Sequence, residues 1–212
     1  MNLKDKFSSI KIVVVLILFA SGCATSQKFL VDKKTGQWEA KLKISDFNEK
    51  KIYSLDMSVI AEKPDLFRAE ISGSLGIAIA SILLKGRQLS YAAHRTKSFY
   101  SGLTDDQALK PVLQVGLDPK YLMNVFFDDT IEEYGWNCKK NQNQVVESCL
   151  RETDKLFIEW FERSGESKRV LIRGRDFEVQ IVVKSFQTKV QNREKVFELS
   201  PPNNYKFHNL NK

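Results

Sequence analysis

Side chains that could perform catalysis are sparse in this sequence. Its 212 residues include two histidines, His94 and His208, that could transfer protons near neutral pH. There is no glycine-rich phosphate loop, no Gly-x-Ser-x-Gly nucleophile motif and no His-Glu-x-x-His zinc motif. We therefore expect a protein that is not an enzyme and that uses no cofactor or metal ion.

The stretch "DDTIEEYG" brings four carboxylates together, on Asp128, Asp129, Glu132 and Glu133. Carboxylates at close spacing can bind Ca²⁺ or work as a general acid and base. This spacing matches no calcium-binding loop, so the sequence favours a solvated acidic turn.

A basic stretch, "ESKRVLIRGR", lies near an expected turn and contains Lys168, Arg169, Arg173 and Arg175. Clustered basic side chains next to a membrane can contact lipid phosphates. The simpler interpretation, which we prefer, is a solvated hairpin.

Two cysteines, Cys138 and Cys149, flank the polar stretch "NCKKNQNQVVESC". A disulfide between them would close a short loop and stabilise the fold by about 2–3 kcal/mol. Two free thiols are the alternative. A metal pair is disfavoured because neither histidine stands at ligand spacing from the cysteines.

The first residues have the form of a secretory leader. Lysines at positions 4, 6 and 11 precede an apolar stretch of nine residues, Ile12 to Ala20, which is too short to span a bilayer. The following "ASGC" resembles the lipobox of bacterial lipoproteins, with Ala20 where Leu is usual. This resemblance implies that residues 1–22 are removed and that Cys23 is acylated, for example with palmitate. Ala24 after the cysteine favours the outer membrane, with the protein facing the periplasm.

The remaining chain has the length of one domain, and residues 23–36 read as the acylated cysteine and a polar tether. The formal net charge of +7 is modest and spread out. A basic protein outside the cytoplasm meets anionic lipid rather than nucleic acid. We therefore expect outer-membrane lipid as a partner, no nucleic acid, and a monomer with a single domain over residues 37–212.

Alternating apolar and polar residues predict β-strands at 38–44, 53–59 and 67–71. Further strands are expected at 155–163, 168–174, 177–187 and 195–200. Between the two groups lies a helical stretch, in which Thr104 would cap a helix up to Gly116 with a kink at Pro111. A second helix is expected from Pro119. This order predicts an α+β fold, a strongly curved antiparallel sheet with helices packed in its concavity.

The stretch "EISGSLGIAIASILLKG", residues 70–86, does not alternate. Ile77 to Leu84 is apolar at every position except Ser81, which predicts a central strand with apolar contacts on both faces. Leu75 stands between two glycines in "GSLG". Spacing alone leaves two alternatives for Leu75, an exposed tip or a side chain tucked against its own sheet.

The segment from about Trp38 to about Phe127 resembles the outer-membrane lipoprotein receptor LolB and its relatives. The matching residues are Phe67, Arg68, Ile71 and the pair Leu75-Gly76. Ser74 and Val125 depart from the pattern, which usually has Pro and Trp there. The resemblance implies an unclosed β-barrel with a short α-helical lid over an apolar cavity. It also implies that Leu75 and Gly76 form an exposed loop that helps insertion into the membrane.

By this resemblance, the protein would take acylated lipoproteins from a LolA-like periplasmic carrier and insert their acyl chains into the outer membrane. A scaffolding lipoprotein of the envelope that uses the same fold as an interaction platform is the alternative. The cavity would be lined by apolar side chains, although for any one of them a place in the packed core is the more frequent role. The expected lining residues are Trp38, Leu42, Leu55, Met57, Phe67, Ile79, Leu83, Leu122, Phe126, Trp160 and Ile181.

Overall fold

The computed structural model describes residues 34–188, 190 and 193–211. The expected leader, the expected acylation site Cys23 and most of the expected tether lie outside the described residues. The first half of the chain contains six strands and a short 3₁₀ turn: β1 (Thr35–Asp46), β2 (Lys51–Glu62), β3 (Leu66–Ser72), η2 (Ser74–Gly76), β4 (Ala78–Lys85), β5 (Gln88–Ala93) and β6 (Ser98–Leu103). The strand β1 begins at Thr35 and therefore includes the last two residues of the expected tether.

Two short helices follow, α2 (Lys110–Leu113) and α3 (Tyr121–Phe127). The second half of the chain then contains β7 (Trp136–Lys140), β8 (Val146–Arg151), β9 (Leu156–Ser164), β10 (Ser167–Arg173), β11 (Phe177–Gln187), α4 (Arg193–Val196) and β12 (Lys206–Asn209).

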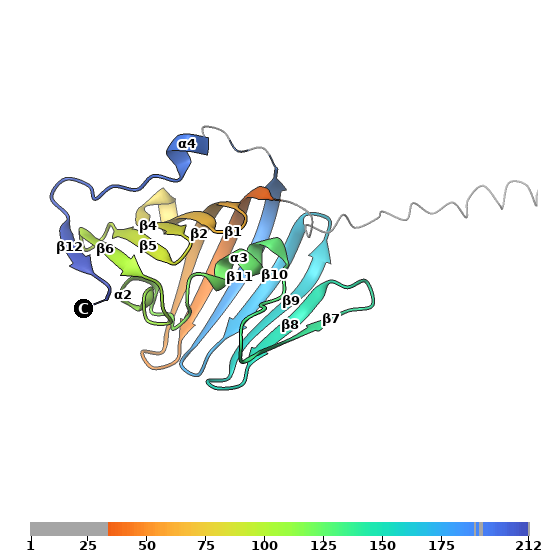
Figure 1. The fold of residues 1–212 in the computed structure, drawn as a ribbon. Helices are drawn as coiled ribbons and strands as arrows, with labels where there is room; N and C mark the ends of the chain where they lie inside the picture. Colours follow the sequence, from red (N-terminus) through yellow and green to blue (C-terminus); the bar gives the residue numbers. More distant parts are fainter. Residues whose placement is uncertain (1–33, 189, 191–192, 212) are drawn as a thin grey trace, which may run out of the picture.

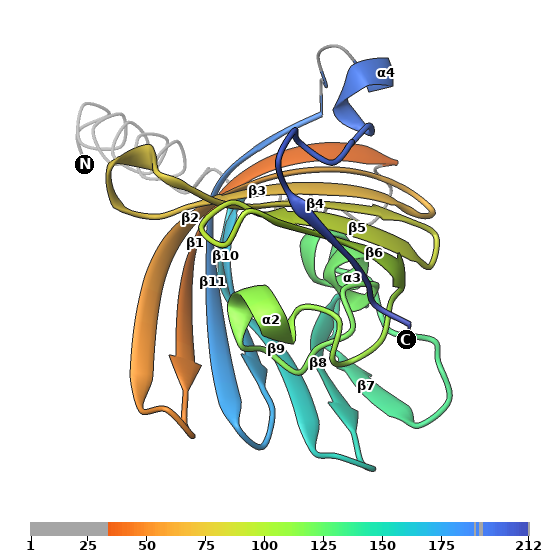
Figure 2. The same cartoon turned by 90° about the vertical axis from the view of Figure 1, so that its left-hand side faces the viewer.

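Within the described chain, the strands form one 12-stranded sheet in the order β12-β6-β5-β4-β3-β2-β1-β11-β10-β9-β8-β7. Neighbouring strands are antiparallel except β12, which runs parallel to β6. The sheet curls strongly around α3 and stays open between its edge strands, β12 and β7 (Figures 1 and 2). The predicted fold class, a curved and unclosed antiparallel sheet with a short helical lid, is confirmed.

Alternation explains why β1 forms and which way it faces. Trp38 and Leu42 are buried on the concave side, while Glu39 and Lys41 point to solvent. Leu42 lies opposite Leu55 of β2 and Ile181 of β11, so the concave faces of three strands meet in one apolar layer. Cross-strand apolar pairs of this kind are a main source of sheet stability.

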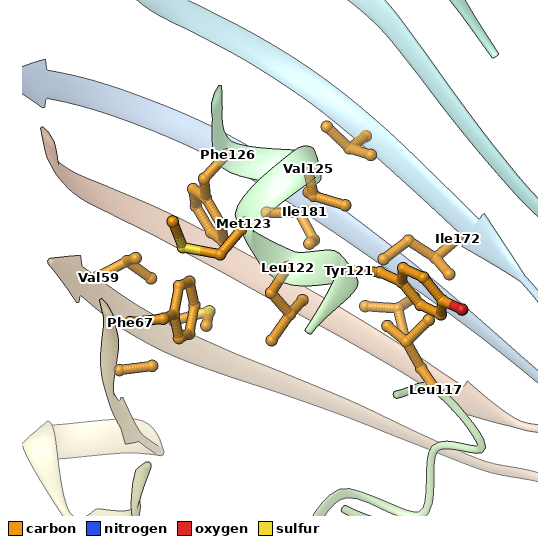
Figure 3. Close-up of a cluster of buried hydrophobic side chains, with 14 of the residues drawn as sticks. Val59, Phe67, Leu117, Tyr121, Leu122, Met123, Val125, Phe126, Ile172 and Ile181 are labelled. Carbon is orange, nitrogen blue, oxygen red and sulfur yellow. The ribbon is translucent and has the colours of Figure 1, made fainter. Parts of the chain in front are cut away.

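The helix α3 fills the middle of the curled sheet. Six of its seven residues are buried, and Figure 3 shows Leu122, Met123 and Phe126 directed at side chains of the sheet. The Phe126 ring lies 5.5 Å from that of Trp38 and 5.9 Å from that of Phe67, measured between ring centroids. The described residues thus form a continuous core, and a fragment that begins after Cys23 contains what this core needs.

The strand β4 is covered on both faces, as its sequence predicts. Ile82 and Leu84 face the concave core, whereas Ser81 and Leu83 face the convex side and are also buried. The C-terminal segment passes over this convex side (Figure 2). It is held there by hydrogen bonds from Arg68 Nη1 to the Glu198 carbonyl, 3.2 Å, and between His94 Nδ1 and the Tyr205 hydroxyl, 2.9 Å.

Two expectations about local structure are wrong, and one strand, β12, was not expected. Residues 195–200 form no strand, because the chain there makes the short helix α4 and then crosses the sheet. The helix expected from Thr104 to Gly116 is reduced to the four residues of α2, and the Thr104 hydroxyl donates to the Asp118 carboxylate instead of capping a helix. The strand β12 has no alternating pattern that would have predicted it.

In the part of the chain that the structure describes, helices are too short or too polar to cross a membrane.

Candidate functional site

An apolar cleft of about 440 Å³ opens at one end of the curled sheet, beside α2. Figure 2 shows α2 lying across this end, in front of the strands. The walls are the concave faces of β1, β2, β4 and β5 together with α2. The lining residues are Ile44, Tyr53, Leu55, Ile79, Ala93, Arg95, Thr96, Pro111, Val112, Leu113 and Gln114. A mostly apolar cleft with a few polar groups is typical of a small-ligand site.

The expected cavity-lining residues fall into three groups. Leu55 and Ile79 line the cleft. Leu83 does not, because it lies on the convex face of β4 opposite Arg68 and Ser90, so its assignment is a correction. The remaining eight belong to the packed core, where α3 occupies the space that an open cavity would need: Trp38, Leu42, Met57, Phe67, Leu122, Phe126, Trp160 and Ile181.

The helix α2 belongs to a strap, residues 104–118, whose two ends are fastened together. The Thr104 hydroxyl donates to the carboxylate of Asp118, and the Asp118 amide donates to Asp106 Oδ1 at 3.1 Å. Between these ends, no residue of α2 is buried, and the helix stops at Gln114 in a left-handed conformation. The strap is therefore fixed at its base and also by the buried residues Leu109 and Val115 beside α2, while α2 itself contacts the cleft through partly buried apolar side chains.

The loop between β3 and β4 projects from the sheet (Figure 2). Leu75 at its tip is 99% exposed, and Ile77 is 67% exposed. The loop is closed by a hydrogen bond from the Gly73 amide to the Ile77 carbonyl, 2.9 Å. A Cβ on Gly73 would lie 3.2 Å from Ile79 Cδ1, so the loop directly adjoins a lining residue of the cleft. The predicted exposure of Leu75 is confirmed, and its role in insertion stays a prediction.

Leu75 also has an unfavourable backbone conformation, with φ 61° and ψ 21°. A bulky residue in this left-handed region costs roughly 1–2 kcal/mol, whereas glycine adopts it freely. An apolar side chain in water on a strained backbone does nothing for the stability of the fold. Strain of this kind occurs most often at functional sites.

The far side of the molecule holds α3 with a buried polar cluster. Lys168 Nζ donates to the carbonyl oxygens of Val125 and Phe126, at 2.9 and 2.8 Å, and to Asp128 Oδ1 at 2.8 Å. All three donors of the ammonium group are thus used to satisfy the C-terminal end of α3. Burial lowers the pKa of Lys168, and the Asp128 carboxylate opposes this shift.

The interpretations of the two charged stretches are therefore corrected in part. Lys168 is only 3% exposed, so the basic hairpin is not solvated at this residue. Asp128 is buried as its partner, and Asp129 is paired with Lys63 at 2.7 Å. Glu133 accepts hydrogen bonds from Lys120 and Tyr121, and the Lys120 bond lowers the pKa of this carboxyl. The carboxylates expected in a solvated turn are mostly structural partners of α3 and its surroundings.

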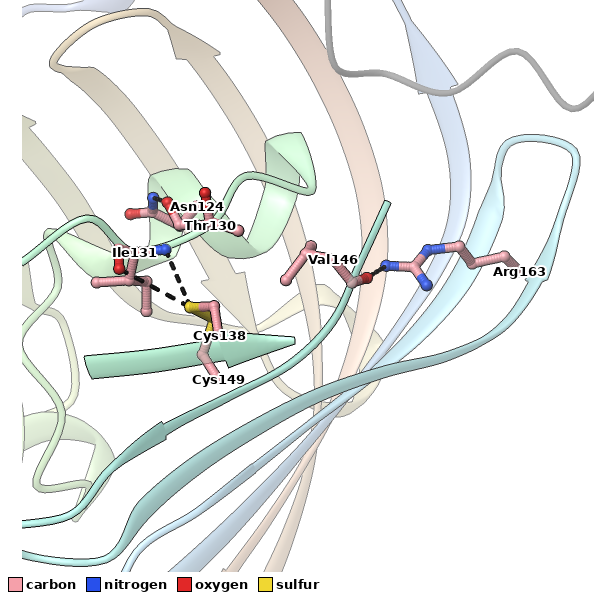
Figure 4. The surroundings of a disulfide bond; sticks show 7 residues. All are labelled: Asn124, Thr130, Ile131, Cys138, Val146, Cys149 and Arg163. Carbon is pink, nitrogen blue, oxygen red and sulfur yellow. Dashed lines mark hydrogen bonds between the residues drawn. A yellow bond between two sulfur atoms is a disulfide. The ribbon is translucent and has the colours of Figure 1, made fainter. Parts of the chain in front are cut away.

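Cys138 and Cys149 face each other across β7 and β8, with Cα atoms 4.0 Å apart and their sulfur atoms joined (Figure 4). The Ile131 amide donates to Cys138 Sγ at 3.4 Å, which ties the chain after α3 to this hairpin. Oxidation of the pair in the purified protein stays a prediction.

His94 belongs to a hydrogen-bonded cluster that lies away from the cleft. Among the residues that the structure describes, no group of three or more His, Cys, Asp or Glu side chains is placed to hold a metal ion. His94 lies 2.9 Å from the hydroxyls of Ser81 and Tyr205, in a cluster that fixes the C-terminal segment on the convex face. The cleft lies on the opposite, concave face.

Sequence reasoning missed the part of the cleft that comes from α2 and the turn after β5. Arg95, Val112 and Leu113 line the cleft, but none stands in an alternating pattern that would mark it. The apolar residues beside Pro111 were the available signal, because a short helix interrupted by proline has too few residues to bury itself.

The chain is similar to known proteins in structure but not in sequence. No protein-family model matches the chain, and no curated protein sequence matches it. A LolA superfamily protein from Nitrosomonas europaea has a similar structure, with a TM-score of 0.50 and 8% identity over 79% of this chain and 91% of that chain. An uncharacterized conserved protein from Thermus thermophilus matches with a TM-score of 0.36 and 8% identity, over 82% of this chain and 90% of that chain. The chain thus shares the fold of a LolA superfamily protein.

Proposed function

We propose that the protein is a lipid-anchored receptor of the outer membrane that accepts an acyl chain of a lipoprotein in the cleft beside α2. It would receive the lipoprotein from a LolA-like periplasmic carrier and help to place the chain in the membrane. The observation that carries this proposal is the apolar cleft next to a loop whose leucine is 99% exposed.

The physical task explains why these two features belong together. Each methylene group moved from an apolar site into water costs about 0.8 kcal/mol, so an acyl chain must pass from one apolar surface to another. Leu55, Ile79 and Val112 offer such a surface inside the cleft. Leu75 and Ile77 offer side chains that can enter lipid at the rim, and each would gain about 1.5–3 kcal/mol on burial.

The strap 104–118 supports release as well as binding. Its base is fixed by Thr104, Asp106 and Asp118, and Leu109 and Val115 on either side of α2 are buried, whereas none of the four residues of α2 itself is buried. Segments with few buried contacts open at low free-energy cost. A cleft covered by such a helix can admit a chain and later give it up without unfolding the sheet.

Displacement of a fluorescent apolar dye tests the binding step. Residues 24–212 should bind the dye, and a dipalmitoylated cysteine peptide should displace it, whereas the same peptide without acyl chains should not. Leu113→Glu places a carboxylate at the cleft wall and should weaken dye binding about tenfold or more, because a charge is costly in an apolar site.

Leu103→Glu is the matched control, because Leu103 is 50% exposed on β6 and does not line the cleft. It should leave dye binding unchanged. Failure of the acylated peptide to displace the dye would refute the proposal and favour the scaffold alternative. Equal losses in both variants would show that the dye binds elsewhere.

A further inference from the structure

Arg95 places a positive charge at the rim of the cleft and forms no ion pair with the described residues. Arg95 lies in the turn between β5 and β6, is exposed, and lines the cleft together with Thr96 and Gln114. Among the described residues no carboxylate lies within ion-pair distance of its guanidinium group, and the lining residues include no aspartate or glutamate.

Several other arginines of the described chain form ion pairs with carboxylates. Arg151 pairs with Asp106 at 2.9 Å and with Asp154 at 2.6 Å. Arg173 pairs with Glu178 at 2.6 Å, and Arg68 with Glu70. Each of these guanidinium groups is held on the surface of the sheet by carboxylates of the same chain. Arg95 instead stands at the boundary between water and an apolar cleft.

We propose that the cleft also binds a free long-chain fatty acid, with its carboxylate on Arg95 and its chain along Leu55, Ile79 and Val112. A guanidinium group matches a carboxylate in a bidentate geometry, which gives both energy and orientation. The cleft volume of about 440 Å³ lies at the low end of the range for ligand pockets, which suits a single chain.

This inference rests on the proposed function, because it uses the same cleft for an acyl chain. It also goes beyond that function. An acyl chain in ester or amide linkage carries no charge at its head, so transfer of a lipoprotein does not require Arg95. A preference for an anionic head group would therefore identify a second class of ligand.

The test compares dodecanoate with dodecanol by calorimetry on residues 24–212 at pH 8, where the acid is ionised. The two ligands share one chain and differ in head-group charge. The unchanged protein should bind dodecanoate about fivefold more tightly than dodecanol. Arg95→Gln should remove this preference by weakening dodecanoate alone. Arg87→Gln is the matched control, because Arg87 is an exposed arginine in the turn between β4 and β5, at the other end of these strands.

Four outcomes decide the question. Loss of the preference in Arg95→Gln, with Arg87→Gln unchanged, supports the inference. Equal binding of acid and alcohol by the unchanged protein overturns it and leaves acyl-chain binding intact. A preference that survives Arg95→Gln also overturns it. Binding of neither ligand refutes the proposed function, and this inference with it.

Discussion

The two helices on the concave side of the sheet are held in opposite ways. Six of the seven residues of α3 are buried, and Lys168 and Trp160 from the sheet both bind the carbonyl oxygen of Val125 at its C-terminal end. None of the four residues of α2 is buried. One helix completes the core, and the other covers a space that stays unfilled.

This difference explains how one sheet can be stable and still bind a ligand. Packing α3 against Trp38 and Phe67 uses the apolar surface that a fully open cavity would expose. The stability gained there allows the other end of the sheet to keep an apolar cleft under a short helix with no buried residue. The following predictions test whether α3 contributes more to the stability of the fold than α2 does.

The largest effect is expected at the polar cluster that holds α3. Lys168→Met leaves the Asp128 carboxylate buried with only Arg163 nearby, at 3.7 Å, and should lower the free energy of unfolding by about 3–5 kcal/mol. Urea denaturation measures this change. Arg169 follows Lys168 on β10 and forms an exposed ion pair with Glu162 of β9. The control variant Arg169→Met removes this pair and should lower the free energy of unfolding by less than about 1 kcal/mol.

Adding Asp128→Asn to Lys168→Met should recover part of the loss, because no charge is then left buried. Asn is the suitable replacement, since residue 128 has φ 58° and asparagine tolerates this left-handed conformation. Similar small losses for Lys168→Met and Arg169→Met would contradict the anchored role of α3.

A pair of identical substitutions compares the helices directly. Leu122→Ala removes a buried side chain of α3 and should lower the free energy of unfolding by about 2–5 kcal/mol. Leu113→Ala in α2 faces the open cleft, leaves no closed cavity, and should cost about 1 kcal/mol or less. Equal costs in thermal or urea unfolding would show that α2 is as firmly packed as α3.

The cysteine pair lies at the end of the sheet that holds α3, because Cys138 contacts the chain just after this helix. Replacing Cys138 and Cys149 with alanine should lower the free energy of unfolding by about 2–3 kcal/mol, given their sequence separation of 11. In the unchanged fragment 24–212, mass spectrometry after alkylation should find no modified thiol. Alkylation of both cysteines without a reductant would show that the disulfide is absent.

The smallest change in stability is expected at the tip of the loop. Leu75→Glu should change the free energy of unfolding by no more than about 0.5 kcal/mol, because the side chain is fully exposed. Dye binding in the cleft should persist, while transfer of an acylated peptide into lipid vesicles should fail. Leu75→Gly, which suits the left-handed backbone, should be at least as stable and should also transfer poorly. Normal transfer by both variants would rule out a role for Leu75 in insertion.

Local sequence patterns were sufficient for much of the fold. Alternation in β1 identified Trp38 and Leu42 as concave and Lys41 as exposed, because a strand has a period of two whatever surrounds it. The glycines around Leu75 left its exposure open, and the exposed loop that the structure shows was implied by the resemblance to LolB and its relatives. The double-sided apolar run of β4 correctly indicated cover on both faces.

Local sequence patterns could not predict features that depend on partners far away in the sequence. Lys168 is buried because Asp128 and the end of α3 lie against it, 40 residues away in sequence. Leu83 looked like a cavity residue, but its direction follows from the pairing of β4, and its cover is a C-terminal segment more than 100 residues later. The cleft itself arises where α2 ends early, which no periodic pattern marks.

The place of β1 in the sheet has a mechanical consequence. This first described strand is not at an edge but is hydrogen-bonded along its length to β2 on one side and β11 on the other. A pull on the chain ahead of Thr35 would load both ladders at once in shear, so that many hydrogen bonds must break together instead of peeling away one after another. Resistance to such a pull is set by the unfolding rate and not by equilibrium stability. A protein tethered through its N-terminal segment would therefore keep its cleft intact while its body is dragged against a membrane surface.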